Sequence, residues 1–129
     1  MLDTNICIYI IKKRPLSVLN RFSTIPRDEI CISVVTLAEL RYGVEKSSSK
    51  RFNQRILDDF LLRLTVLYWD ENAAMQYGKT RAFLEKKGLP IGNMDLLISV
   101  HALSQKHILV SNNLGEFERV PDLRYENWV

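Results

Sequence analysis

Cysteine and histidine are scarce in this chain, which holds only 2 of each among 129 residues. Cys7 and Cys31 both lie inside apolar runs, with no CxxC spacing and no histidine nearby in the sequence. This pattern argues against a zinc site or a disulfide framework and predicts buried, reduced thiols. Reduced thiols indicate a reducing compartment, so we expect a cytoplasmic protein.

Long hydrophobic runs are also absent. No apolar stretch approaches the roughly 18 residues that a membrane span requires, and the N-terminus lacks the pattern of a signal peptide. Repeats, low-complexity tracts and interdomain linkers are missing as well. We therefore expect no membrane association and a single domain over residues 1–129, long enough to bury a core without staples.

Charge is only slightly unbalanced, with a formal net charge of +3. This mild basic excess suits a polyanionic partner but does not demonstrate one. Most basic side chains are expected to be ordinary solvated residues, and a subset near a functional site would hold a phosphate backbone. The candidates are Lys12, Lys13, Arg14, Lys46, Lys50, Arg51, Lys79, Arg81, Lys86 and Lys87.

The hydrophobic pattern alternates between strand-like and helix-like segments. Strands are predicted to end at Asp3 and to cover 30–33, 64–68, 108–110 and 123–125. Helical spacing predicts helices at 5–12, 16–22, 36–45, 51–62, 71–87 and 94–106, with Asp70 and Asn93 as N-caps, Gly88 as a C-cap and a turn at 112–115. This order is typical of a doubly wound α/β domain with a mostly parallel sheet, whose strands' carboxyl ends share one ligand-binding edge.

Acidic residues gather at that predicted edge, although each also has an ordinary structural explanation. Asp3 could be the N-cap of the first helix. The spacing of Thr36 and Glu39 matches a capping box, and Asp95 would be favoured by the helix dipole. Glu116 could be plain surface charge. Together, however, packed carboxylates repel one another and raise each other's pKa unless a cation lies among them, so their convergence implies a metal.

Several motifs, in order and spacing, closely resemble those of the VapC-type toxins of the PIN-domain ribonuclease family. They are LDTN at 2–5, TLAEL at 36–40 followed by Tyr42-Gly43, IGNMDLLI at 91–98 with His101-Ala102, SNNLGEF at 111–117 and ENW at 126–128. The resemblance implies a PIN-like three-layer α/β/α domain with about five mostly parallel strands, the first of them central. It also implies the toxin of a type II toxin–antitoxin system, which would be a Mg²⁺- or Mn²⁺-dependent endoribonuclease and a homodimer. A VapB-type antitoxin and a structured RNA such as transfer RNA would be its partners.

The resemblance assigns roles to individual residues. Asp3, Glu39 and Asp95 match the family's acidic triad, and the fourth acidic position falls to either Asn113 or Glu116. Oxygen-only donors select hard cations, Mg²⁺ or Mn²⁺. We expect Asp3 and Asp95 to bind the cation and Glu39 to complete the site directly or by orienting the attacking water. Side chains expected to hold the carboxylates in place are Thr4, Asn5, Ser111 and Asn113.

Other readings stay open at this stage. A non-catalytic nucleic-acid-binding or adaptor domain is favoured if Asn113 leaves the metal site incomplete. A metal-dependent phosphatase of the aspartyl-phosphate type is less favoured, because Asn5 stands where a second aspartate is needed. His101 is expected to pack or hydrogen-bond and not to act as a catalyst. Only two residues precede Asp3, so the central strand is either very short or begins upstream of Met1 in the native chain.

Overall fold

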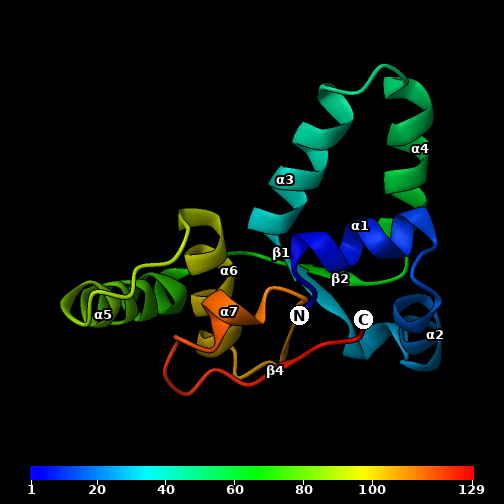
Figure 1. Cartoon of the computed structure of the whole chain (residues 1–129). Helices are drawn as coiled ribbons and strands as arrows, with labels where there is room; N and C mark the ends of the chain where they lie inside the picture. Colours follow the sequence, from blue (N-terminus) through cyan, green and yellow to red (C-terminus); the bar gives the residue numbers. More distant parts are fainter.

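The computed structural model describes all 129 residues and contains one parallel sheet with helices on both sides (Figure 1). Its strands lie in the order β2, β1, Leu2, β3, β4, so the first segment of the chain is central, as predicted. The strand bounds are β1 Cys31–Ser33, β2 Thr65–Leu67, β3 Leu109–Val110 and β4 Tyr125–Glu126.

The central strand is reduced to a single bridging residue. Leu2 pairs in parallel with Ile32 on one side and with Val110 on the other. Its N–H donates to the Cys31 carbonyl at 2.9 Å, and the N–H of Asp3 donates to the Val110 carbonyl at 3.0 Å. The chain then turns directly into a helix, which brings Asp3 to the carboxyl edge of the sheet.

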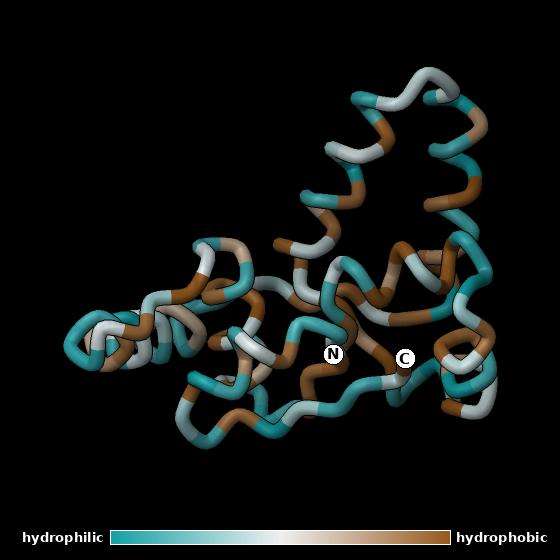
Figure 2. The backbone as a smooth tube through the Cα atoms, viewed as in Figure 1, coloured by the Kyte–Doolittle hydropathy of each residue, from teal (hydrophilic) through white to brown (hydrophobic).

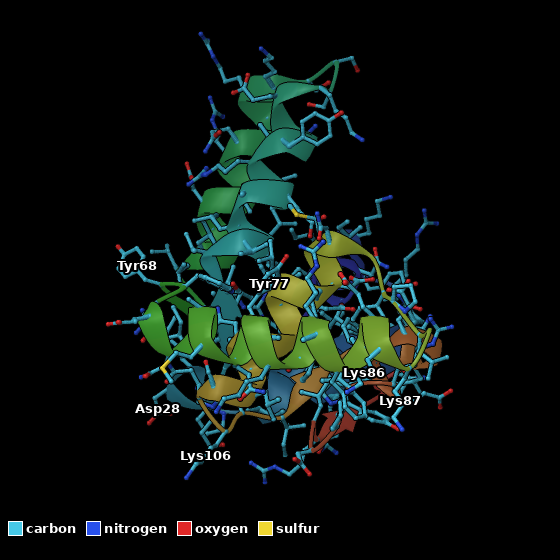
Figure 3. All side chains as sticks on the ribbon, turned by 90° about the vertical axis from the view of Figure 1, so that its left-hand side faces the viewer. Asp28, Tyr68, Tyr77, Lys86, Lys87 and Lys106 are labelled. Carbon is cyan, nitrogen blue, oxygen red and sulfur yellow. The ribbon has the colours of Figure 1, made fainter.

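The helices form two layers. One layer contains α1 Thr4–Lys12, α2 Leu16–Thr24, α3 Val34–Glu45 and α4 Lys50–Leu61, with a 3₁₀ turn at Arg27–Glu29. The other contains α5 Glu71–Lys86, α6 Asn93–Ser104 and α7 Leu114–Phe117. Helices α3 and α4 form a hairpin that rises away from the sheet (Figure 1), and α5 crosses an outer face with Lys86 and Lys87 at one end (Figure 3).

Two hydrophobic cores lie on opposite faces of the sheet, because successive strand residues point to alternate faces. Leu2, Ile32 and Val110 belong to the core under α1 to α4. Their strand neighbours Met1, Cys31 and Leu109 belong to the core under α5 to α7. Hydrophobic segments accordingly gather where the strands meet α1 (Figure 2). The predicted three-layer α/β/α architecture is confirmed.

Most predicted elements are present, and the errors concern their boundaries. The edge strand predicted at 123–125 is observed as β4 Tyr125–Glu126, and several helix starts also differ. Asp70 caps α5 by accepting from Ala73 N, and Gly88 has φ 69°, both as predicted. Asn93 was predicted as an N-cap but is the first residue of α6, and Gly92 occupies the cap position. Instead of the turn predicted at 112–115, α7 begins at Leu114.

Both cysteines are free and buried, as expected. No helix has the length and apolar character needed to cross a membrane.

Candidate active site

Asp3 is the N-cap of α1, which is the ordinary structural role considered for it from the sequence. Its Oδ1 accepts a hydrogen bond of 2.9 Å from Ile6 N, so the carboxylate caps α1. Only 4% of the residue is exposed. Burial raises the pKa of Asp3, the hydroxyl of Ser111 and the amide of Ile6 lower it, and the charge of Glu39 raises it again. The capping carboxylate of Asp3 is therefore close enough to Glu39 for the two charges to interact.

Glu39 projects from α3 and is held from α1. The Thr4 hydroxyl donates a short hydrogen bond to Glu39 Oε1 and lies 3.5 Å from Thr36 Oγ1. The predicted capping box is wrong, because α3 begins at Val34 and Thr36 already lies inside its first turn. Ser33 is the cap instead. The Glu39 carboxylate is therefore not used in a capping box and instead accepts the hydrogen bond from Thr4.

Asp95 lies in the first turn of α6 and carries the largest electrostatic perturbation of the site. Its pKa is raised from 3.8 to about 7. Burial is the first cause, followed by a hydrogen bond with Glu116 and by the negative charges of Glu116, Asp3 and Glu39. Asp3, Glu39 and Glu116 therefore each act electrostatically on Asp95.

Asn113 connects the last two acids. Its Nδ2 donates to Asp95 Oδ2 at 3.2 Å and to Glu116 Oε2 at 3.4 Å. The pKa of Glu116 is lowered, first by its hydrogen bond with Asp95 and also by the Gly92 N–H and by Arg119. The contact between Asp95 and Glu116 therefore displaces their pKa values in opposite directions. Asn113 bonds two acids and adds no charge of its own.

Two further residues named from the sequence contribute in different ways. The Ser111 hydroxyl accepts from Asn113 N at 2.8 Å and donates to Asp3, so it links β3 to the cluster. Asn5 is exposed, and its backbone N–H, not its side chain, bonds to Asp3. The Ser111 side chain therefore contacts the acidic cluster, whereas the Asn5 side chain is exposed.

Arg119 and Gly92 lie beside Glu116, and neither residue was predicted from the sequence to belong to the site. Arg119 Nη1 donates to the Pro90 carbonyl at 3.0 Å, which ties the segment after α7 to the loop before α6. The two Glu116 carboxylate oxygens lie 3.9 and 4.0 Å from the position a Cβ would take at Gly92. The available sequence signal was the opposite charge of Arg119 three residues after Glu116, although Arg119 lies in the turn beyond the end of α7.

The donor set fits a hard cation in chemistry and charge. It consists only of carboxylate oxygens, which Mg²⁺ and Mn²⁺ prefer. A cation would also offset the burial and, to a lesser degree, the repulsion that raise the pKa of Asp3 and Asp95. As the side chains stand, no three acidic, histidine or cysteine residues are close enough to share one ion. The carboxylates would have to move together in order to bind it.

A cleft of about 410 Å³ opens beside the cluster, between α1, α3 and α4. Glu39 and Lys12 lie in its wall among apolar side chains. The apolar residues are Ile8, Ile11, Leu40, Val44, Ile56 and Leu57. Glu39 is therefore shared between the acidic site and an apolar groove.

Comparison with known proteins agrees with this architecture. A PIN-domain profile matches residues 1–123. Ribonuclease VapC2 of Haemophilus influenzae is 51% identical over 129 residues, covering 100% of this chain and 97% of that protein. The tRNA(fMet)-specific endonuclease VapC of Salmonella typhimurium is 45% identical over 128 residues, covering 99% of this chain and 96% of that protein.

Solved structures agree as well. A chain in the crystal structure of VapBC2 from Rickettsia felis, bound to a DNA fragment from their promoter, superposes with a TM-score of 0.94 at 48% identity. The match covers 100% of this chain and 98% of that chain. DNA-bound VapBC from Salmonella typhimurium also gives a TM-score of 0.94, at 45% identity over 100% of this chain and 97% of that one. The chain therefore belongs to the PIN-domain family and, within it, to the VapC ribonucleases.

Proposed function

We propose that this protein is the toxin of a type II toxin–antitoxin system and acts as a metal-dependent endoribonuclease on structured RNA, with transfer RNA as the substrate class. One observation supports the proposal: Asp3, Glu39 and Glu116 come from three separate segments, and the charge of each acts on Asp95 at the carboxyl edge of the sheet. The similarity to an endonuclease specific for tRNA(fMet) supports the choice of substrate. The shared central sheet supports reading residues 1–129 as one PIN domain.

Mg²⁺ or Mn²⁺ held by Asp3, Asp95, Glu39 and Glu116 would activate water and neutralise charge on the phosphate. The protein's own groups prepare that site. With a pKa of about 7, Asp95 can release its proton near neutral pH. Asn113 holds Asp95 and Glu116 side by side.

Glu39 is suited to orient the attacking water. Its Oε1 is engaged by Thr4, whereas Oε2 makes no hydrogen bond and can accept one from water. In-line attack of that water on phosphorus breaks the bond to the 3′ oxygen, leaving a 5′ phosphate and a 3′ hydroxyl. Lys12, in the groove wall, and Arg119, beside Glu116, are the cations placed to contact the RNA backbone.

The protein partner we propose is a VapB-type antitoxin seated in the groove between α1, α3 and α4. An apolar groove that also carries Glu39 and Lys12 suits an amphipathic segment. Similar chains have been solved in VapBC complexes, which supports such a partner. We also propose a homodimer, as the family resemblance implies, and a cytoplasmic location, as expected from the reduced thiols.

The test uses purified protein, transfer RNA and a generic phosphomonoester, each with Mg²⁺ or with a chelator. Chelator-sensitive cleavage at one site is the expected result. RNA binding without cleavage would instead identify an adaptor domain, and turnover of the phosphomonoester alone would identify a phosphatase. The Asp95→Asn protein, in which the perturbed carboxylate is lost, should bind RNA without cutting it.

A further inference from the structure

His101 lies in the interior of α6 and is fully buried, with 0% of its surface exposed. Its Nδ1 lies 2.8 Å from Ser33 Oγ, a residue 68 positions earlier in the chain. Its Nε2 is buried without a hydrogen-bond partner. Burying a polar ring in this way is costly, so the single contact that it makes calls for a physical explanation.

Ser33 ends β1 and caps α3. Its Oγ accepts a hydrogen bond of 3.1 Å from Val35 N, which fixes the direction in which α3 leaves the sheet. Since the oxygen already accepts from Val35, the hydroxyl hydrogen is available to His101 Nδ1. With the hydroxyl donating to Nδ1, the neutral imidazole would carry its own hydrogen on Nε2, the nitrogen that has no hydrogen-bond partner. These two contacts fix the orientation of the Ser33 hydroxyl and of the His101 ring.

This pair joins the two helices that carry Glu39 and Asp95. Helices α3 and α6 pack against each other, and His101–Ser33 is the side-chain hydrogen bond between the segments that form them. Other hydroxyls of α6 bond within their own helix: Ser99 to the Leu96 carbonyl at 3.0 Å and Ser104 to the His101 carbonyl at 2.8 Å. The start of α3 is therefore fixed relative to α6 through His101.

We propose that His101 is a positioning residue of the carboxylate site: by holding Ser33, it sets α3 against α6 and so sets Glu39 relative to Asp95. Thr4 hydrogen-bonds directly to the Glu39 carboxylate, whereas His101 acts at the start of α3, through its hydrogen bond with Ser33. The inference depends on the proposed function in one respect, namely that Glu39 and Asp95 bind the same cation. Residues that orient ligands through another group alter metal affinity by about 10- to 100-fold when they are changed.

The test measures Mn²⁺ affinity by calorimetry on RNA-free protein, at a temperature where circular dichroism shows every variant folded. His101→Phe and Ser33→Ala should each weaken binding about tenfold. His101→Asn, which can still present a polar atom near the Nδ1 position, should restore most of the affinity. The double variant should bind no more weakly than Ser33→Ala alone, because both changes remove one interaction.

Ser99→Ala is the matched control, since Ser99 is equally buried on the same helix but bonds only within it. It should bind Mn²⁺ like the wild type. Wild-type affinity in both Ser33→Ala and His101→Phe, or an equal loss in Ser99→Ala, would overturn the proposal. If His101→Phe fails to fold, Ser33→Ala decides alone. Mn²⁺ binding without RNA cleavage by the wild type would defeat the proposed function only, and absence of Mn²⁺ binding would defeat both.

Discussion

The side-chain amide of Asn113, one of the two residues considered for the fourth acidic position, donates a hydrogen bond to Asp95 across 3.2 Å. The amide also reaches Glu116. A neutral donor between two acids lowers their repulsion, whereas a further carboxylate there would increase it. Glu116 is accordingly the better candidate for the fourth acidic position, and Asn113 is its support.

Asn113→Asp should therefore destabilise the metal-free protein. A new negative charge beside Asp95 and Glu116 is expected to lower the free energy of unfolding by about 1 kcal/mol in chelator, and Mg²⁺ should recover that loss. Urea unfolding with chelator and with Mg²⁺ measures both. Asn112→Asp is the control, because Asn112 is exposed and bonds to Asn127 instead. Equal destabilisation by the two substitutions would contradict the assignment.

Asp3→Asn should abolish RNA cleavage while the protein stays folded. The amide oxygen of asparagine can still accept from Ile6 N, so the α1 cap survives, but the negative charge is lost. Cleavage assays and thermal melts should separate these two effects. Asp70→Asn changes another capping aspartate, on α5, and should leave cleavage intact. Full activity in Asp3→Asn would refute the metal-ligand role.

Thr4→Val should reduce cleavage about tenfold at limiting Mg²⁺, because it removes the donor that orients Glu39 while keeping the side-chain shape. The deficit should shrink as Mg²⁺ is raised, which a titration of initial rates would reveal. Thr80→Val is the matched control, since Thr80 is buried on α5 and accepts a hydrogen bond of 3.0 Å from Gln76. An identical loss in both variants would point to a general packing effect.

The architecture was predictable because periodicity reports which face of an element is buried. The β-branched runs around Ile32 and Val110 identified strands, and Gly88 marked a helix end. Helix starts were less predictable because several polar residues in a row can cap. Thr36 matched a capping box in sequence, yet Ser33 captures the Val35 amide first.

The site was predictable only to the level of its carboxylates. Acids at strand ends meet because parallel strands share an edge. The groups that hold those acids depend on contacts between distant segments, which spacing does not contain. His101 meets Ser33, and Arg119 meets the Pro90 carbonyl, only after α6 and α7 have packed on the sheet.

Ile56→Glu should weaken antitoxin binding without affecting Mn²⁺ binding. Ile56 lies in the groove wall on α4, and a charge there would be buried by an apolar partner segment. A loss of about 2 kcal/mol in binding free energy is expected, measurable by calorimetry with a VapB-type antitoxin. Phe52→Glu is the control on the same helix, because Phe52 is 64% exposed and outside the groove. If only Phe52→Glu weakened binding, the partner would contact the outer face of α4.

Acidification should destabilise the protein partly through His101. Burial lowers the pKa of His101 below 6.5, with His107 lowering it further, while Asp70 and the Tyr68 carbonyl oppose the shift. The unfolded chain therefore takes up a proton near pH 6.5 before the folded protein does, so stability present above pH 6.5 is lost as the pH falls towards the folded pKa. His101→Asn, which cannot take up this proton, should lose less unfolding free energy over the same range. Urea unfolding from about pH 7.5 to about pH 5 measures the difference, and parallel curves for the two proteins would show that His101 protonates equally well in both states.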